Sequence, residues 1–138
     1  MLCNTKKKQN MKKNIVFICL ILFMNSCKSE QNPKDVVLIY LNSIDKYDFI
    51  KAEEQIDLNG EVLRGFNYIK AKAKKMTESE KKAMIQKPNY NIVLKTNENG
   101  FAKVFVSNIE NEARTYIIDF YLKKINGKWK IYKIESNT

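Results

Sequence analysis

The fold is decided by the stretch YNIVLKTNENGFAKVFVS at residues 90–107. Short runs of apolar, mostly β-branched or aromatic residues lie on both sides of Asn99-Gly100, and such runs next to turn residues are typical of strands. Asn-Gly is the strongest short signal for a two-residue hairpin turn, because both turn positions require a positive φ. We therefore predict one strand over Tyr90–Thr96 and an antiparallel partner over Phe101–Ser107.

The same pattern recurs toward the C-terminus. Thr115–Lys123 and Lys128–Glu135 are predicted as two further strands, joined by a second turn at Asn126-Gly127. Side chains alternate between the two faces of a sheet, so one face is expected to pack on helices. The residues expected on that face are Ile92, Leu94, Ala102, Val104, Val106, Tyr116, Ile118, Phe120, Leu122, Trp129 and Ile131.

The opposite face is more apolar than a sheet face in contact with water usually is. It mixes Val93 and Phe101 with Lys95, Lys103 and Lys130. Two explanations stay open: a second copy of the chain covers this face, or the sheet curls strongly enough to shield it. The candidate dimer face consists of Phe105, Ile117, Asp119, Tyr121 and Tyr132.

Helical spacing precedes the strands. Asn32 can cap a helix that begins at Pro33, and Asp48 can cap a second helix that ends near Gly60. A third helix is expected from Glu61 to Met76. Gly65 lies inside it and either weakens the helix or allows the close approach of a neighbour.

A short fourth helix is expected to follow, up to Ile85, because Thr77 and Glu80 have the spacing of a capping box. Helices followed by antiparallel strands predict an α+β domain. We expect three to four N-terminal helices packed on a curved four-stranded antiparallel sheet.

The N-terminus has the features of an export signal. Lys12 and Lys13 precede the apolar run Ile15–Met24, and Ser26 precedes Cys27. The run is ten residues long, whereas a membrane-spanning helix needs about 20. Met11 is the expected true start. A plain signal peptide with a chance Cys, or an uncleaved membrane anchor, stays open as an alternative.

The residues up to Cys27 resemble the lipobox of bacterial lipoproteins, although Met24 and Asn25 depart from it. The resemblance implies that residues 1–26 form a signal peptide, cleaved between Ser26 and Cys27, and that Cys27 carries diacylglycerol. Residues 27–32 would then be the lipidated Cys and its tether, and 33–138 a single domain. The expected location is the bacterial cell envelope, and Lys28 after the Cys favours the outer membrane over the inner one.

The charge and cysteine content agree with export. After Cys27 the chain has 20 Lys and Arg against 15 Asp and Glu, a net +5. Much of the excess lies between Lys70 and Lys87, as either an ordinary solvated helix face or a patch for phospholipid headgroups. Export makes a nucleic-acid partner unexpected. Cys3 and Cys19 lie in the segment to be removed, which leaves no disulfide and no cysteine-based metal site.

The domain resembles the nuclear transport factor 2-like superfamily, the cystatin-like α+β cones. The matching features are the helix that begins with Pro33, the turn Tyr47-Asp48-Phe49, and the hairpin that ends in Gly127-Lys128-Trp129-Lys130. In this superfamily a sheet wraps around helices, and the open end of the cone holds a ligand pocket or an active site. The candidate pocket residues here are Tyr40, Tyr68, Tyr116 and Trp129.

The chain has no His, which removes the commonest general base near neutral pH. Asp48 is interpreted as a helix cap, Asp45 as solvated surface, and Asp119 as a cross-strand partner of Lys103 or Lys130. We expect a non-catalytic, membrane-tethered domain that binds a small ligand or a partner protein, without cofactor or metal. The alternatives are an enzyme of the same fold that uses Asp119 or Asp48 with a Tyr, and a purely structural dimer.

Overall fold

A computed structural model describes residues 30–85, 89–110 and 114–137, with side chains described except at 108–110, 114–116 and 137. The predicted signal peptide, its cleavage point and the lipidated Cys27 lie outside the described residues. Within them, no helix is both long and apolar enough to cross a membrane.

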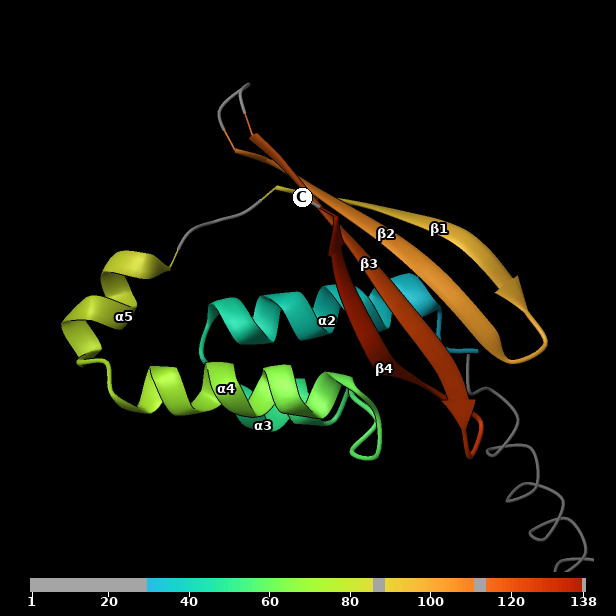
Figure 1. Cartoon of the computed structure of the whole chain (residues 1–138), viewed down its shortest axis with the longest axis horizontal. Coiled ribbons are helices and arrows are strands. Elements are labelled where there is room, and N and C mark those ends of the chain that lie inside the picture. The colour runs from blue at the N-terminus through green and yellow to red at the C-terminus, as the bar shows by residue number, and fades with distance from the viewer. Residues whose placement is uncertain (1–29, 86–88, 111–113, 138) are drawn as a thin grey trace, which may run out of the picture. The chain divides into compact units, whose positions relative to one another are not determined.

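Four helices come first in the described chain (Figure 1): α2 (Pro33–Asp45), α3 (Phe49–Glu53), α4 (Val62–Lys74) and α5 (Glu78–Met84). The caps expected for three of them are confirmed. Asn32 Oδ1 accepts the Lys34 N–H at 2.9 Å, and Asp48 Oδ1 accepts the Lys51 N–H at 3.2 Å. A complete capping box opens α5, so these side chains satisfy backbone donors that a helix start leaves unpaired.

The strands form one antiparallel sheet in the order β1-β2-β3-β4, with β1 (Tyr90–Glu98), β2 (Phe101–Glu110), β3 (Arg114–Ile125) and β4 (Lys128–Asn137). Both predicted hairpin turns are confirmed. Asn99 and Gly100 have φ of 52° and 77°, and Asn126 and Gly127 have 51° and 77°. Two successive positive φ values match the right-handed twist of the flanking strands.

The core lies between the helices and the face of the sheet predicted to meet them, and the bent strands cross α2 obliquely (Figure 1). The prediction for the inner face is confirmed wherever side chains are described. Ile92, Leu94 and Ile118 pack against the core, and the others are buried: Ala102, Val104, Val106, Phe120, Leu122, Trp129 and Ile131. The side chain of Tyr116 is outside the described set. The shared core supports an α+β architecture.

The expected second helix is wrong in its length. It ends at Glu53, and Gln55–Asp57 instead continues the sheet beside β4. The Ile131 N–H donates to Gln55 O at 2.9 Å, and the Asp57 N–H donates to Ile131 O at 2.8 Å. Ile56 is only 2% exposed, so this parallel bridge buries the same side chain that a longer helix would have buried.

The two glycines of the helical half have different roles. Gly60 is no helix stop, because α3 already ends at Glu53. A Cβ on Gly60 would lie 2.7 Å from the backbone oxygen of Tyr132. The missing side chain lets the loop approach β4. A Cβ on Gly65 would meet nothing within 4 Å, so Gly65 serves no close approach and only lowers the helix propensity of α4.

Candidate functional site

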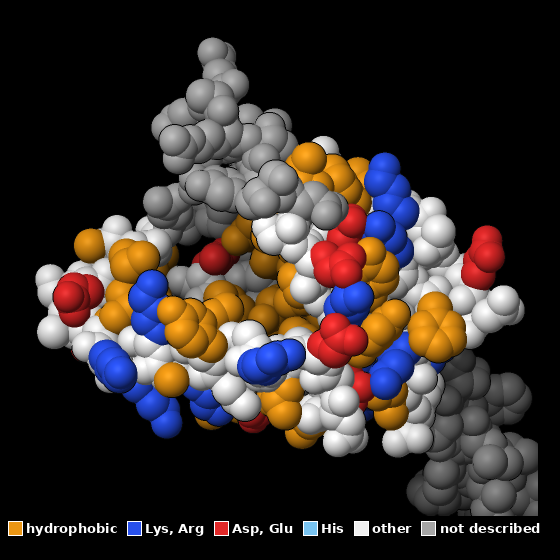
Figure 2. Space-filling view, in the orientation of Figure 1, with side chains coloured by type: hydrophobic (Ala, Val, Ile, Leu, Met, Phe, Trp, Pro, Cys, Tyr) orange, Lys and Arg blue, Asp and Glu red, His pale blue; other side chains and the backbone are white. Residues whose placement is uncertain are grey.

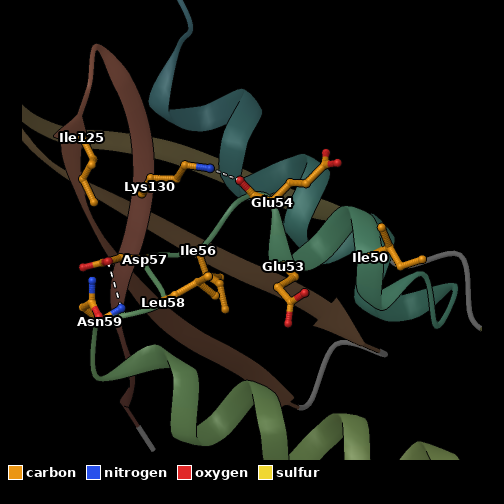
Figure 3. A pocket seen from close by; sticks show the side chains of 9 residues that line it. All are labelled: Ile50, Glu53, Glu54, Ile56, Asp57, Leu58, Asn59, Ile125 and Lys130. Carbon is orange, nitrogen blue, oxygen red and sulfur yellow. Dashed lines mark hydrogen bonds between the residues drawn. The ribbon is translucent and has the colours of Figure 1, made fainter.

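A groove of about 430 Å³ lies where α3, the segment that follows it and the β3–β4 hairpin come together (Figure 3). This volume is within the range of about 300–1,000 Å³ that is usual for ligand sites. The groove is open on one side, so an occupant would be partly covered. Its lining residues are Ile50, Glu53, Glu54, Ile56, Asp57, Leu58, Asn59, Ile125 and Lys130.

The apolar lining is unusual in its exposure. Ile56 is buried, whereas Leu58 is 55% exposed and Ile50 is 80% exposed. Ile125 faces the groove from the hairpin, opposite the side chains that α3 contributes (Figure 3). Single exposed aliphatic residues are ordinary on protein surfaces, but several around one concave surface offer an apolar contact area.

The charged groups of the groove are mostly engaged. Asp57 Oδ2 lies 2.7 Å from Lys123 Nζ, and Asp57 Oδ1 accepts the Asn59 N–H at 3.0 Å. The hydrogen bond from Lys123 lowers the pKa of Asp57 despite its burial. Lys130 Nζ donates to the backbone oxygen of Glu54 (Figure 3). The buried carboxylate therefore stays ionised and holds the loop to the sheet.

A second groove of about 550 Å³ adjoins the first at the same loop. It shares Leu58 and Asn59 with the first and is otherwise lined by Gly60, Glu61, Leu63, Arg64 and Asn67. Leu58 therefore borders both concave surfaces. This places the residues that follow α3 at the centre of the candidate site.

The four candidate pocket residues from the sequence occupy different environments. Tyr40 is 4% exposed and makes an edge contact with Phe120 at 6.1 Å between ring centres. Burial raises the pKa of Tyr40 to about 12. Trp129 is 3% exposed, and Tyr68 is 70% exposed on α4. The side chain of Tyr116 lies outside the described set, and the other three residues line neither groove.

Asp45 differs from the solvated surface residue that its sequence context suggested. It is half-buried at the end of α2, and Tyr90 donates its hydroxyl hydrogen to Asp45 Oδ2 at 2.6 Å. Burial raises the pKa of Asp45, although the Tyr90 hydrogen bond opposes the shift. A carboxylate at a helix C-terminus also faces the negative end of the helix dipole. Asp45 is therefore an acid whose environment disfavours its charge.

Asp119 has the partner that the sequence suggested. It is 6% exposed on the outer face of the sheet, and its Oδ2 lies 2.9 Å from Lys103 Nζ. Asp48, the other acid considered for catalysis, caps α3. Both acids thus have structural roles as cross-strand partner and helix cap.

Lysine side chains cover the aromatic rings of the candidate dimer face. Lys95 lies over Phe105 and Lys103 over Tyr121, at 5.1 and 5.0 Å from ammonium to ring centre. Lys123 covers Tyr132 at 5.6 Å. Blue, red and orange side chains alternate over the strands in Figure 2. Lysine ammonium groups thus lie over the rings of this face, and those of Lys103 and Lys123 also pair with the buried carboxylates of Asp119 and Asp57. The sequence interpretation did not consider this form of cover.

The sequence interpretation also missed the residues that build the groove. The sequence pattern places Gln55–Asp57 inside a helix and assigns no partner to Lys123. Asp57-Leu58-Asn59-Gly60 is rich in turn-forming residues, and this signal could have placed the predicted end of the helix earlier.

Among the described residues, no three His, Cys, Asp or Glu side chains gather as a metal site would require.

No protein-family model and no curated protein matches this chain.

Proposed function

We propose that this chain is a lipid-anchored envelope lipoprotein whose domain binds other molecules without catalysing a reaction. In this proposal, Cys27 carries the lipid after cleavage behind Ser26. The domain has the nuclear transport factor 2-like fold, an assignment supported by the curved antiparallel sheet with helices packed on one face (Figure 1). The occupant of the groove has an apolar part, whether it is a small amphipathic molecule or an apolar segment of a partner protein.

The observation that carries the binding proposal is the pair Ile50 and Leu58 at the mouth of the groove. Both are more than half exposed, at 80% and 55%, above the buried floor residue Ile56. Covering an aliphatic side chain releases about 25 cal/mol for each Å² of apolar surface. An occupant of this groove would bury both.

The membrane anchor is tested by growing cells with an alkyne-labelled fatty acid and following the label on the chain. We expect the wild type to carry the label and Cys27→Ala to carry none. An unlabelled wild-type chain in a soluble fraction would refute the anchor. This test does not depend on the groove.

The groove is tested by native mass spectrometry of the chain purified from membranes of its host. We expect a bound mass that is lost in Ile50→Asp and Leu58→Asp. Leu38→Asp is the matched control, because Leu38 is 40% exposed on α2 and lines neither groove. A small bound mass identifies a ligand and a large one a protein partner. Equal occupancy in the two groove variants and the wild type would refute this site.

A second candidate function, an enzyme of the same fold, is favoured by one observation. Asp45 is a half-buried acid with a raised pKa, and its carboxylate accepts a hydrogen bond from Tyr90. Such an acid can donate or accept a proton nearer to neutral pH than a free carboxyl group. A hydrolase or isomerase activity that Asp45→Asn abolishes, while the variant stays folded, would establish this alternative.

A further inference from the structure

The net positive charge of the domain is concentrated in one stretch of sequence. Residues 62–84 hold 7 Lys and Arg against 2 Glu, a net +5. The whole of residues 28–138 has the same net charge, because the remainder holds 13 cations and 13 anions. Helices α4 and α5 therefore form a cationic region on an otherwise balanced domain.

One side of α4 carries this charge outward. Val62, Phe66 and Ala73 face the core and are 5%, 1% and 3% exposed. Residues four apart, and then three apart, lie on one face of a helix. The side opposite the core is accordingly a stripe of exposed residues, which consists of Arg64, Tyr68, Lys72 and Lys75.

Acidic residues neutralise only part of this region. Lys70 pairs with Glu53 at 3.4 Å, and Lys81 pairs with Glu78 at 2.7 Å. Glu61 lies one turn before the stripe begins and reduces the charge at that end. Within residues 30–85, 89–110 and 114–137, no ion pair involves the remaining cations, which are Arg64, Lys72, Lys74, Lys75 and Lys82. In Figure 2, blue and orange side chains lie next to one another over α4 and α5, with a red one at the α5 end.

Exposed apolar groups lie on the same two helices. No residue of α5 is buried, although a complete capping box stabilises its start. Met84 is 60% exposed, Ile85 beside it is 46% exposed, and Tyr68 on α4 is 70% exposed. A helix with no buried residue, and with aliphatic groups next to cations, has the chemistry of a segment that lies on a membrane surface. Tyr is favoured at the level of the lipid headgroups because one end of its side chain is apolar and the other polar.

We propose that α4 and α5 dock the domain on an anionic lipid surface. Arg64, Lys72 and Lys75 face the headgroups, while Tyr68 and Met84 enter the interface. The inference rests on the proposed membrane location. The short stretch between Cys27 and Pro33 would keep an anchored domain close enough to the bilayer for this contact.

The test uses the full chain with Cys3, Cys19 and Cys27 replaced by Ser, so that no lipid is attached. One new cysteine, Ala71→Cys, carries an environment-sensitive nitrobenzoxadiazole dye on the exposed side of α4. The control dye is placed at Asn97→Cys, an exposed position on β1. Vesicles contain phosphatidylcholine with or without phosphatidylglycerol. Every sample carries the same apolar run at the N-terminus, so this run cannot account for a difference between samples. The dye on α4 therefore reports the docking of that helix.

We expect the emission of the dye at residue 71 to shift to the blue on phosphatidylglycerol vesicles only, and to return toward its solution value as salt is added. The dye at residue 97 is expected to stay unchanged. Each lysine near an anionic surface contributes about a fivefold factor in binding, the equivalent of about 1 kcal/mol. Lys72→Gln, Lys74→Gln and Lys75→Gln together should therefore weaken docking about a hundredfold.

The matched control removes the same charge elsewhere, through Lys34→Gln, Lys46→Gln and Lys51→Gln on α2, its C-terminal cap and α3, and should leave the response intact. Equal spectra on neutral and anionic vesicles, or an equal loss in both triple variants, would overturn the inference. A blue shift of the residue-71 dye emission that appears at higher protein concentration without vesicles would also overturn the inference, because a second copy of the chain would then cover α4. Fatty-acid labelling of Cys27 is a separate measurement, so a failed anchor and a failed docking face can be told apart.

Discussion

Gly60→Ala should destabilise the domain, because the added methyl group has no room. Its Cβ would lie 2.7 Å from the backbone oxygen of Tyr132 and 2.9 Å from the Cα of Tyr132. Backbone atoms of a strand cannot rotate away as a side chain can. Overpacking in proteins typically costs about 1–3 kcal/mol, and the stiffness of β4 favours the upper part of that range. Replacing Gly by Ala also restricts the unfolded chain, which stabilises the folded state by about 0.4–1 kcal/mol. The expected net loss of unfolding free energy is therefore about 2 kcal/mol.

The matched control is Gly65→Ala, where the new Cβ meets nothing within 4 Å. A Gly-to-Ala change inside a helix should stabilise the fold by about 0.5–1 kcal/mol. Urea unfolding can be followed through Trp129, the single Trp of the chain, which is 3% exposed in the folded state. The two variants should move the urea midpoint in opposite directions at an unchanged slope.

Equal midpoints for Gly60→Ala and the wild type would refute the close approach of the loop to β4. Because that approach positions Leu58 between the two grooves, a destabilised Gly60→Ala should also lose the bound mass expected for the wild type. A variant that unfolds more easily yet keeps full occupancy would separate the loop from the binding site.

Three further predictions concern charge and assembly. Asp45→Asn should be about 0.5–1 kcal/mol more stable than the wild type at pH 7. Because the pKa of Asp45 is raised in the folded state, this gain should vanish below the ordinary value of 3.8, where the wild-type carboxyl is also protonated. Thermal melts that show no gain at neutral pH would contradict this. Asp57→Asn should lose about 1–2 kcal/mol of unfolding free energy near neutral pH, because it breaks the ion pair with Lys123. Since the pKa of Asp57 is lowered in the folded state, the stability difference from the wild type should persist below pH 3.8 and disappear at still lower pH. A stability difference that is independent of pH would argue against the ion pair. Phe105→Glu and Tyr121→Glu should convert a dimer into monomers in light scattering if the outer sheet face joins two copies, and monomers throughout would end the dimer proposal.

Much of the fold could be predicted because its signals are local. Asn32, Asp48 and Thr77 cap helices through bonds to residues two or three positions away. Asn99-Gly100 and Asn126-Gly127 specify their hairpins by backbone conformation alone. Once the turns are fixed, alternation assigns the strand residues to faces, except at two register shifts that the sequence does not indicate, between Leu94 and Thr96 on β1 and at Tyr132 on β4.

The candidate site could not be predicted because its contacts join distant parts of the chain. Ile56 suits the apolar side of a helix as well as a bridge to Ile131, and only the position of β4 decides between them. Asp57 and Lys123 lie 2.7 Å apart in space, yet nothing in their separate sequence contexts pairs them. A helix pattern predicts a solvated Asp45, because it does not show that the Tyr90 hydroxyl will reach its carboxylate.

The bridge between Ile56 and Ile131 has a consequence for assembly. A sheet recruits further strands through the unpaired N–H and C=O groups at its borders, and an uncovered border invites fibre growth. Both backbone groups of Ile131 are taken by Gln55 and Asp57, so the β4 border is blocked at its middle. A strand added at β4 would have to displace this loop, whereas within the described residues no such bridge covers the β1 border, so strand addition is expected at β1.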